Sequence, residues 1–384
     1  MAILGKFSGA SNTVGIDIGS HSIKVVQVVS TRNGYALMRA GSTLTPVEAV
    51  KQGVVEDRFA VAESVRRLLQ DLGITSPMAI AALSGPSVVV RQVQLPAMPE
   101  HQLRKSIYWE ARNYISFPVE DSLLEFQILN THTQDGIPQM DVMLVAAPRE
   151  LVDSRVAALE QAGVEPIAVE LEPFALIRAA IDLPMGLAGP QESLALVDIG
   201  ATYTNISIIA NGIFGLTRSV MTAGNSFTEA IAKVLGVEML QAERIKEEET
   251  QVVVDEASRA QLSPVGQEAS RAIESTLEEL VREIRRSFAF YDYQQNPAGG
   301  GDQRTVAGIS RVILSGGSAK LGGIAHYLQD QLSIPVDLVD LFGHHLVHLP
   351  DGAEELQAQM PLLATAFGLA LREPMLARER GGLR

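Results

Sequence analysis

The stretch Val14–Val29, VGIDIGSHSIKVVQVV, returns in a related form at Leu194–Ile209, LALVDIGATYTNISII. In both stretches an apolar strand pattern ends at Asp-Ile-Gly, a polar bend with small hydroxyl residues follows, and a second β-branched strand pattern begins. We therefore expect two β-hairpins with glycine-containing tips. Because the second half of the chain repeats the design of the first, the sequence predicts two similar α/β domains.

Each bend offers groups that can hold a phosphate. Asp17 and Asp198 each end a strand, and Gly19 and Gly200 allow a ligand to approach the backbone closely. The hydroxyl and N–H groups that follow suit phosphate oxygens, and the carboxylates suit Mg²⁺. A single bend of this kind would more often be an ordinary turn, because Asp and Gly are common turn residues. Two copies favour a pair of facing loops around a nucleotide.

A third segment supports this interpretation. Arg311–Ser315 is a short run typical of a buried strand, and it enters the turn Gly316-Gly317-Ser318 before a helical pattern begins. A strand, a glycine-rich turn and a helix in this order suit the binding of a phosphate or a nucleoside.

Composition excludes several classes of protein. The chain has 384 residues, 46% hydrophobic and 20% charged, and is long enough for two or three domains with conventional cores. Its net charge of -14 would repel DNA, RNA and anionic lipid, which argues against nucleic acid as a partner. The absence of cysteine excludes disulfides and a cysteine nucleophile. No apolar run approaches the ~18 residues of a membrane span and the N-terminus lacks a signal-peptide core, so we expect a cytoplasmic protein.

The rest of the chain alternates between helix and strand patterns. Phe59–Leu72 has the apolar spacing of a helix, and Gly73 is a suitable C-cap. We interpret residues 84–165 as a small inserted α/β subdomain, with Tyr108 and Trp109 in its core unless a partner groove exposes one of them. Further patterns predict strands over 88–95 and 140–146 and helices over 100–114, 149–162, 226–235, 242–249, 268–293 and 362–371.

The three loop segments resemble those of the actin, heat-shock-protein-70 and hexokinase superfamily, whose two halves hold ATP between them. GIDIGSHSIK resembles the first phosphate loop, VDIGATYTNI the second, and ILSGGSAKLGGI the adenosine loop. The resemblance implies that Asp17 and Asp198 hold Mg²⁺, mostly through water. It also implies contacts to ATP or ADP from residues of all three loops: Gly19, Ser20, His21, Ser22 and Lys24; Gly200, Ala201 and Thr202; Gly316, Gly317 and Ser318.

Two other segments resemble the connecting helices of this superfamily. In ELEPFALIRA, Glu170–Ala179, Glu172 matches the catalytic residue that positions the attacking water, and Pro173 stands at the helix start. Glu172 could equally be a helix N-terminal carboxylate that interacts with the helix dipole. PLLATAFGLAL, Pro361–Leu371, resembles the second connecting helix, whose small residues allow close packing at a hinge.

Within the superfamily the chain resembles the PilM family of type IV pilus assembly proteins, which is related to the cell-division protein FtsA. The resemblance spans Val14 to Leu371 and is carried by IYWEARNYISFPVEDSLLEFQIL (Ile107–Leu129), AERIK (Ala242–Lys246) and EIRRSFAFY (Glu283–Tyr291). It implies that residues 84–165 form an FtsA-type subdomain. It also implies that Glu243, Lys246 and Arg286 or Ser287 border the adenine and the ribose.

The implied fold class is α/β, with duplicated actin-like (ribonuclease-H-like) domains around a nucleotide cleft. The expected segments are part of the first domain at 1–83, the insertion at 84–165, the first-domain connecting helix at 166–190, the second domain at 191–345 with a small subdomain at about 233–305, and a return to the first domain at 346–384.

The family implies a cytoplasmic ATP-binding scaffold that reaches the inner membrane through a protein partner. The implied partner is the N-terminal cytoplasmic tail of a PilN-like inner-membrane protein, and we also expect contacts with other inner-membrane and motor components of the pilus. The sequence leaves open whether the protein associates with itself. FtsA has a membrane-binding helix, whereas Pro374–Arg384 is short and weakly apolar, so we expect no direct membrane insertion. Ala201 replaces the Gly or Asp of many superfamily members, which leaves open whether ATP is hydrolysed or is turned over at most slowly.

Two alternatives belong to the same superfamily. One is a filament-forming cytoskeletal protein like FtsA. The other is a small-molecule kinase, which would need a general-base Asp near the acceptor hydroxyl, and the sequence shows no convincing pattern for that site.

Overall fold

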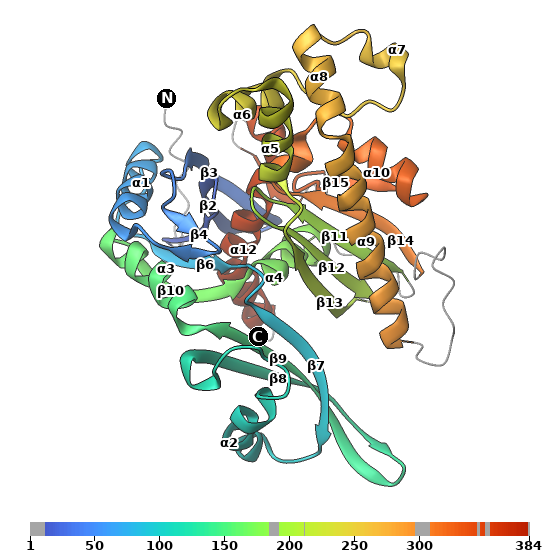
Figure 1. The fold of residues 1–384 in the computed structure, drawn as a ribbon. Coiled ribbons are helices and arrows are strands. Elements are labelled where there is room, and N and C mark those ends of the chain that lie inside the picture. Colours follow the sequence, from blue (N-terminus) through green and yellow to red (C-terminus); the bar gives the residue numbers. More distant parts are fainter. Residues whose placement is uncertain are drawn as a thin grey trace.

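Two large sheets with helices around them lie side by side, and a smaller sheet projects from the first (Figure 1). The computed structural model describes residues 12–183, 192–210, 212–295, 308–343, 346–349 and 354–382. The predicted segment boundary at 190–191 lies outside the described residues. Each large sheet contains one of the repeated hairpins, so the predicted duplication is confirmed.

The first hairpin lies in the middle of a six-stranded sheet. Its two strands are buried on both faces, which explains their nearly continuous apolar and β-branched sequence. In spatial order the strands are β10 (Glu165–Leu171), β6 (Met78–Leu83), β1 (Thr13–Ile18), β2 (Ser22–Thr31), β3 (Gly34–Leu44) and β16 (Val347–His348).

Helices cover both faces of the first sheet. The pair α1 (Arg58–Asp71) and α3 (Arg149–Gln161) packs on one face, and the pair α4 (Glu172–Ile177) and α12 (Met360–Gly382) packs on the other. The predicted insertion, residues 84–165, includes α3. In the structure its buried Ala158 and Leu159 instead pack with α1 into the core of the first sheet.

The second sheet repeats the strand order of the first. The run β14-β11-β12-β13 corresponds to β6-β1-β2-β3, with one parallel pair followed by two antiparallel pairs. Its strands in spatial order are β13 (Ile213–Val220), β12 (Thr204–Ala210), β11 (Ser193–Ile199), β14 (Ile309–Ser315) and β15 (Val336–Leu338). The helices of this half are α5 (Gly224–Leu235), α6 (Met239–Glu248), α7 (Glu256–Arg259), α8 (Pro264–Ala272), α9 (Glu274–Gln295) and α10 (Ile324–Leu332).

The helix predicted over 268–293 is divided between α8 and α9. Ile273, at φ -85° and ψ -7°, is the C-cap of α8 and stands between the two helices. The predicted apolar stripe is confirmed, because it is buried in the core of the second half: Ile273, Leu277, Leu280, Ile284 and Phe288.

The small sheet consists of β7 (Val89–Pro96), β9 (Ile137–Pro148) and β8 (Ser122–Gln134), with α2 (Glu100–Ala111) packed on it. A short 3₁₀ helix at Val119–Asp121 precedes β8. The expectation that Tyr108 and Trp109 are core residues is wrong, since they are 48% and 66% exposed. The buried face of α2 is formed by Leu103, Ile107 and Ala111, and at helical spacing residues 108 and 109 lie on the other side.

Two helices connect the halves. α12 packs on β1, β2 and α4 and also contacts β14 of the second sheet. Gly368 allows the crossing of α12 with α4, because a Cβ atom there would lie 1.8 Å from the carbonyl oxygen of Ala175. The helix predicted over 362–371 is present as part of the longer α12, Met360–Gly382, and Pro374 lies within it.

The remaining elements are the strand pair β4 (Val50–Lys51) and β5 (Val54–Val55), the π-helical turn Arg178–Asp182 after α4, and α11 (Glu354–Gln357). Within the residues that the structure describes, no helix combines the length and hydrophobicity needed to cross a membrane.

Candidate functional site

The tips of the two hairpins form opposite walls of one cleft of about 530 Å³. All but two of the residues predicted to bind a nucleotide or Mg²⁺ line this cleft. They are Asp17, Gly19, Ser20, His21, Ser22, Lys24, Glu172, Asp198, Gly200, Ala201, Thr202, Glu243, Lys246, Gly316, Gly317 and Ser318.

The two tips have the same turn. The N–H of Gly19 donates to the carbonyl of Ser22 at 3.1 Å, and the N–H of Gly200 donates to that of Tyr203 at 3.0 Å. The repeated sequence thus folds into a repeated backbone geometry, although the residues between the hydrogen-bonded pairs differ.

The tips also touch each other and the rest of the first sheet. The hydroxyl oxygens of Ser20 and Thr202 lie 2.7 Å apart, which is hydrogen-bond distance across the cleft. Thr45, which follows β3, donates its hydroxyl to the carbonyl of Gly19 at 2.7 Å and its N–H to that of His21 at 2.9 Å. Thr45 therefore holds the backbone of the first tip, while the Ser20 hydroxyl of that tip faces the second tip.

The two aspartates at the strand ends have different partners. Asp17 forms an ion pair with Lys24, its cross-strand neighbour on β2, at 2.9 Å. Asp198 accepts a hydrogen bond from the hydroxyl of Ser315 at 2.6 Å. At the position equivalent to Lys24, the second hairpin has Asn205, so the two walls of the cleft differ in charge.

Glu172 also lines the cleft, close to Asp17 and Asp198. It lies in the first turn of α4 and is 8% exposed. Burial, the charge of Asp198, a hydrogen bond with Asp198 and the charge of Asp17 together raise the pKa of Glu172 well above its ordinary range. A protonated Glu172 can donate to Asp198 while it accepts from the amide of Asn205 at 3.2 Å. This buried hydrogen bonding explains the position of Glu172 better than a simple helix-dipole contact.

This end of the cleft fits a hydrated divalent cation. Carboxylate oxygens are ligands that Mg²⁺ prefers. Asp17 and Asp198 both lie close enough to Glu172 to raise its pKa, so three carboxyl groups are near one another. The charges of Asp198 and Asp17 add to the effect of burial on the pKa of Glu172, so a cation bound here would lower that pKa.

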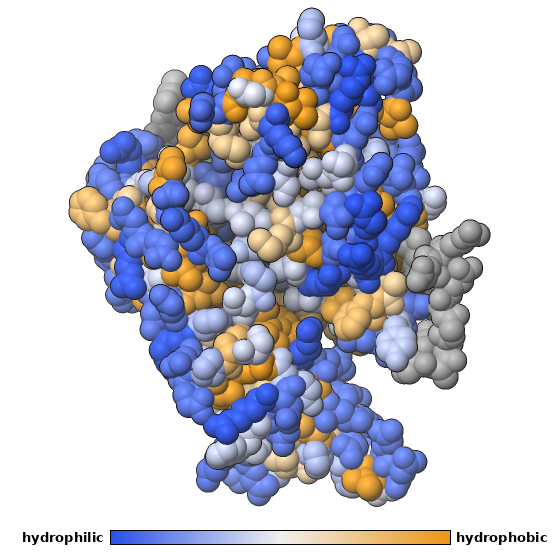
Figure 2. All heavy atoms as spheres, viewed as in Figure 1, coloured by the Kyte–Doolittle hydropathy of each residue, from blue (hydrophilic) through white to orange (hydrophobic). Residues whose placement is uncertain are grey.

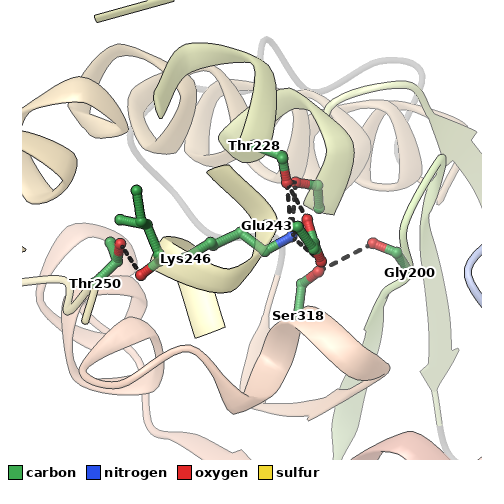
Figure 3. Close-up of polar contacts among 8 residues, drawn as sticks. Gly200, Thr228, Glu243, Lys246, Thr250 and Ser318 are labelled. Carbon is green, nitrogen blue, oxygen red and sulfur yellow. Dashed lines mark hydrogen bonds and ion pairs between the residues drawn. The ribbon is translucent and has the colours of Figure 1, made fainter. Parts of the chain in front are cut away.

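The second half contributes an ion pair from α6 (Figure 3). The Lys246 amine lies 2.8 and 2.7 Å from the two carboxylate oxygens of Glu243 and donates to the Thr228 hydroxyl at 2.8 Å. Burial alone would raise the pKa of Glu243, but the Lys246 charge and hydrogen bonds from Lys246 and Thr228 hold it below its ordinary value. His21 of the first tip has a ligand atom within 4.8 Å of those of Glu243 and Glu247, so α6 closes over the first hairpin.

The third loop follows β14. Gly316 has φ +90°, and a Cβ atom there would lie 2.4 Å from the carbonyl oxygen of Ile199, so only glycine fits. A 3₁₀ helix at Gly317–Lys320 comes next, and the Ser318 hydroxyl donates to the Gly200 carbonyl at 3.2 Å (Figure 3). The predicted third loop and second hairpin are therefore adjacent.

Two predicted residues do not line the cleft: Arg286 and Ser287. Both belong to α9, which packs against β12 and β13. Arg286 is exposed and pairs with Glu283, while the fully buried Ser287 hydroxyl donates to the Glu283 carbonyl at 2.9 Å and accepts from Arg218 at 3.3 Å. Ser287 thus links α9 to β13 through Arg218, whereas the Arg286–Glu283 pair lies within α9.

The cleft also contains residues that the sequence analysis missed, including Ser84, Arg155 and Asn205. Asn205 could have been found by aligning the two repeats, because it corresponds to Lys24. Arg155 has no local signal, since it reaches the cleft only because α3 packs on the first sheet. Burial lowers the pKa of its guanidinium, and the charges of Asp17 and Glu172 oppose this effect.

Two domains of one strand order, joined by crossing helices around a cleft, define the actin-like class of proteins. The structure of MreB5 of Spiroplasma citri bound to AMPPNP shares this fold, with a TM-score of 0.51, 13% identity, and coverage of 97% of this chain and 98% of that one.

The chain belongs to the PilM family, because the sequence profile described as type IV pilus assembly protein PilM matches residues 15–374. A solved PilM-PilN type IV pilus biogenesis complex is similar, with a TM-score of 0.80, 30% identity, and coverage of 95% of this chain and 99% of that one. Cell division protein FtsA of Bacillus subtilis (strain 168) is 23% identical over 355 residues, which cover 83% of this chain and 76% of FtsA.

Proposed function

We propose that this protein binds ATP or ADP with Mg²⁺ between its halves and serves as a scaffold in type IV pilus assembly. The observation that carries the proposal is the pair of matching hairpin turns, each preceded by an aspartate, that face each other across one cleft. Membership of the PilM family supports the role in pilus assembly, and the shared fold of AMPPNP-bound MreB5 supports nucleotide binding.

Each wall of the cleft has a role in this proposal. Asp17 and Asp198 hold Mg²⁺, mainly through water, and Lys24 and the two hairpin tips bind the phosphates. The Glu243–Lys246 pair is suited to the ribose hydroxyls, since it offers an acceptor and a donor side by side. The loop at Gly316–Ser318 lies against the adenosine.

Turnover of ATP is slow at most in this proposal, and Glu172 is the residue that positions the attacking water. In the nucleotide-free protein the raised pKa of Glu172 favours the protonated carboxyl group, which cannot accept a proton from water. Bound Mg²⁺ would oppose protonation and restore the carboxylate.

The proposed partner is the N-terminal cytoplasmic tail of a PilN-like inner-membrane protein, as the similar PilM-PilN complex suggests. We place it between the first domain and the small sheet, which would recruit the chain to the inner membrane. Hydrophobic residues gather near this junction on the face shown in Figure 2. Leu83, Val90, Met143, Ala147, Leu151 and Leu171 form the buried part of the cluster at this junction. β10 is an edge strand of the first sheet, so an extended peptide could pair with it.

The test is calorimetric titration of the purified protein with Mg-ATP and, separately, with a synthetic peptide of the tail of the PilN-like protein from the same genome. Each titration is then repeated with the other ligand at saturation, because coupling between two sites must be reciprocal. Binding of both, with changed affinities in the paired titrations, is the expected result. Peptide binding without nucleotide binding would reduce the protein to a passive scaffold.

A further inference from the structure

The buried Arg155 guanidinium lies where the phosphate end of the cleft meets the helix that leads from the small sheet. Arg155 is 3% exposed and lines the cleft. Its Nη1 donates to the carbonyl of Ile18 at 2.8 Å, and its Nη2 donates to that of Gly53 at 2.9 Å. Ile18 directly precedes the first hairpin tip, and Gly53 lies in the turn between β4 and β5.

Arg155 also has unused hydrogen-bonding capacity. Its Nε–H is buried and has no partner among the residues that the structure describes. A buried N–H without a partner is costly, and a guanidinium donor forms its strongest hydrogen bonds with anionic oxygens. Arg155 lines the cleft, so a shift of its guanidinium toward an anionic ligand there could give the Nε–H the acceptor that it lacks.

The same helix leads directly to the small sheet. α3 begins at Arg149, immediately after β9 ends at Pro148. Leu151, one helical turn before Arg155 and therefore on the same face, packs with Val90 and Met143 of the small sheet. The face of α3 that contacts the small sheet thus continues to the guanidinium in the cleft.

We propose that Arg155 is the positioning residue through which the phosphate end of the cleft is coupled to the small sheet. The proposal rests on the function proposed above. A phosphate that gives the Nε–H an acceptor favours one position of the guanidinium, and the rest of α3 must follow because it is a packed helix. Through its contacts, Leu151 then favours one arrangement of the small sheet. A peptide bound beside the small sheet has a different affinity for each arrangement, so its affinity changes.

The experiment measures a coupling factor, which is the ratio of the peptide dissociation constants without and with saturating Mg-ATP. It compares the wild type with Arg155→Lys and Arg155→Gln. Lysine keeps the charge but cannot bridge the carbonyls of Ile18 and Gly53 as a planar fork does. We expect a wild-type factor of at least about fivefold. Both variants should still bind the peptide alone, with a factor reduced to near one.

Ser154→Ala is the matched control. Ser154 is the neighbouring residue on α3, is fully buried, and accepts a hydrogen bond from the Val55 N–H at 3.1 Å. Its loss should lower the melting temperature in the same way as a change at Arg155 but leave the coupling factor unchanged. Hydrogen exchange of the β7 and β9 amides gives a second readout, since Mg-ATP should alter it in the wild type and in Ser154→Ala but not in Arg155→Lys.

Four results would overturn the inference. A wild-type factor in the Arg155 variants would remove Arg155 from the coupling while leaving the proposed function intact. Equal loss of coupling in Ser154→Ala would show that any weakening of α3 suffices. A wild type that binds no Mg-ATP, or that binds both ligands without coupling, would overturn the inference as well, and only the first of these would also remove nucleotide binding from the proposed function.

Discussion

Asp17 and Asp198 occupy equivalent places in the two hairpins, yet one faces a lysine and the other a serine. If both hold Mg²⁺, removal of either carboxylate should weaken Mg-ATP binding. We expect Asp17→Ala and Asp198→Ala each to lower the affinity at least tenfold, which corresponds to about 1.4 kcal/mol. Calorimetric titration measures the change, and circular dichroism shows whether each variant is folded.

Asp330→Ala serves as the control for this pair. Asp330 lies on α10, with a half-exposed side chain near His326, and it does not line the cleft. Its replacement should leave the nucleotide affinity unchanged. Wild-type affinity in both cleft variants would rule out the assignment of the metal-binding residues.

Glu172 predicts a pH dependence of stability in the nucleotide-free protein. Its pKa is raised in the folded state, so the fold keeps a proton that the unfolded chain releases as the pH rises. The stabilisation from protonation is therefore complete below the ordinary carboxyl pKa and is lost as the pH rises toward the folded value. Glu172→Gln keeps the hydrogen bonds of a protonated acid but does not titrate.

Urea unfolding at several pH values between about 5 and 8 tests this prediction. The free energy of unfolding of Glu172→Gln should rise relative to the wild type with increasing pH. Titrating groups that do not interact with Glu172 cancel in the difference between the two proteins. A difference that stays constant over this range would show that Glu172 is ionised throughout.

At the scale of elements, the crossing of α4 and α12 depends on one glycine. Alanine favours helices over glycine by roughly 0.5–1 kcal/mol, so propensity alone predicts that Gly368→Ala stabilises the protein. A Cβ atom 1.8 Å from the Ala175 carbonyl oxygen must instead push the helices apart. We expect destabilisation of about 1–3 kcal/mol, measured by urea unfolding.

Gly322→Ala is the comparison for this substitution. A Cβ atom at Gly322 would lie 3.4 Å from its nearest neighbour, a side-chain atom of Gln251, which is ordinary contact. Its stability should remain close to that of the wild type. A Gly368→Ala protein as stable as the wild type would show that the two helices can separate at no cost.

The elements that could be predicted from the sequence are those with a local pattern. Both hairpins, α1 and the apolar stripe of α9 follow from periodicity within one segment. The placement of α3 could not be predicted, because it depends on packing against α1, and the break at Ile273 does not interrupt the apolar stripe. Trp109 is apolar but lies on the exposed side of its helix, so its hydrophobicity misled the prediction.

At the scale of the molecule, the same distinction applies to the site. Loop residues such as Gly19 and Gly316 could be found because the residues that shape these loops are neighbours in the sequence and form short motifs. Arg155 and Ser287 could not be placed, since both are helical residues whose surroundings depend on distant segments. Short motifs thus predicted the loops of the cleft and the helical residues Glu172, Glu243 and Lys246, whereas a residue such as Arg155 reaches the cleft only through the packing of distant segments.

The whole molecule finally predicts where the protein is found in the cell. If membrane contact comes only through a PilN-like partner, a fluorescent fusion at native expression should lie at the cell envelope in the wild-type host. It should become diffuse in the cytoplasm when the partner gene is deleted, and it should return to the envelope when that gene is restored. A fusion that stays at the envelope without the partner would mean that this chain or another protein anchors it. Elongated structures in either strain would instead favour a filament-forming role.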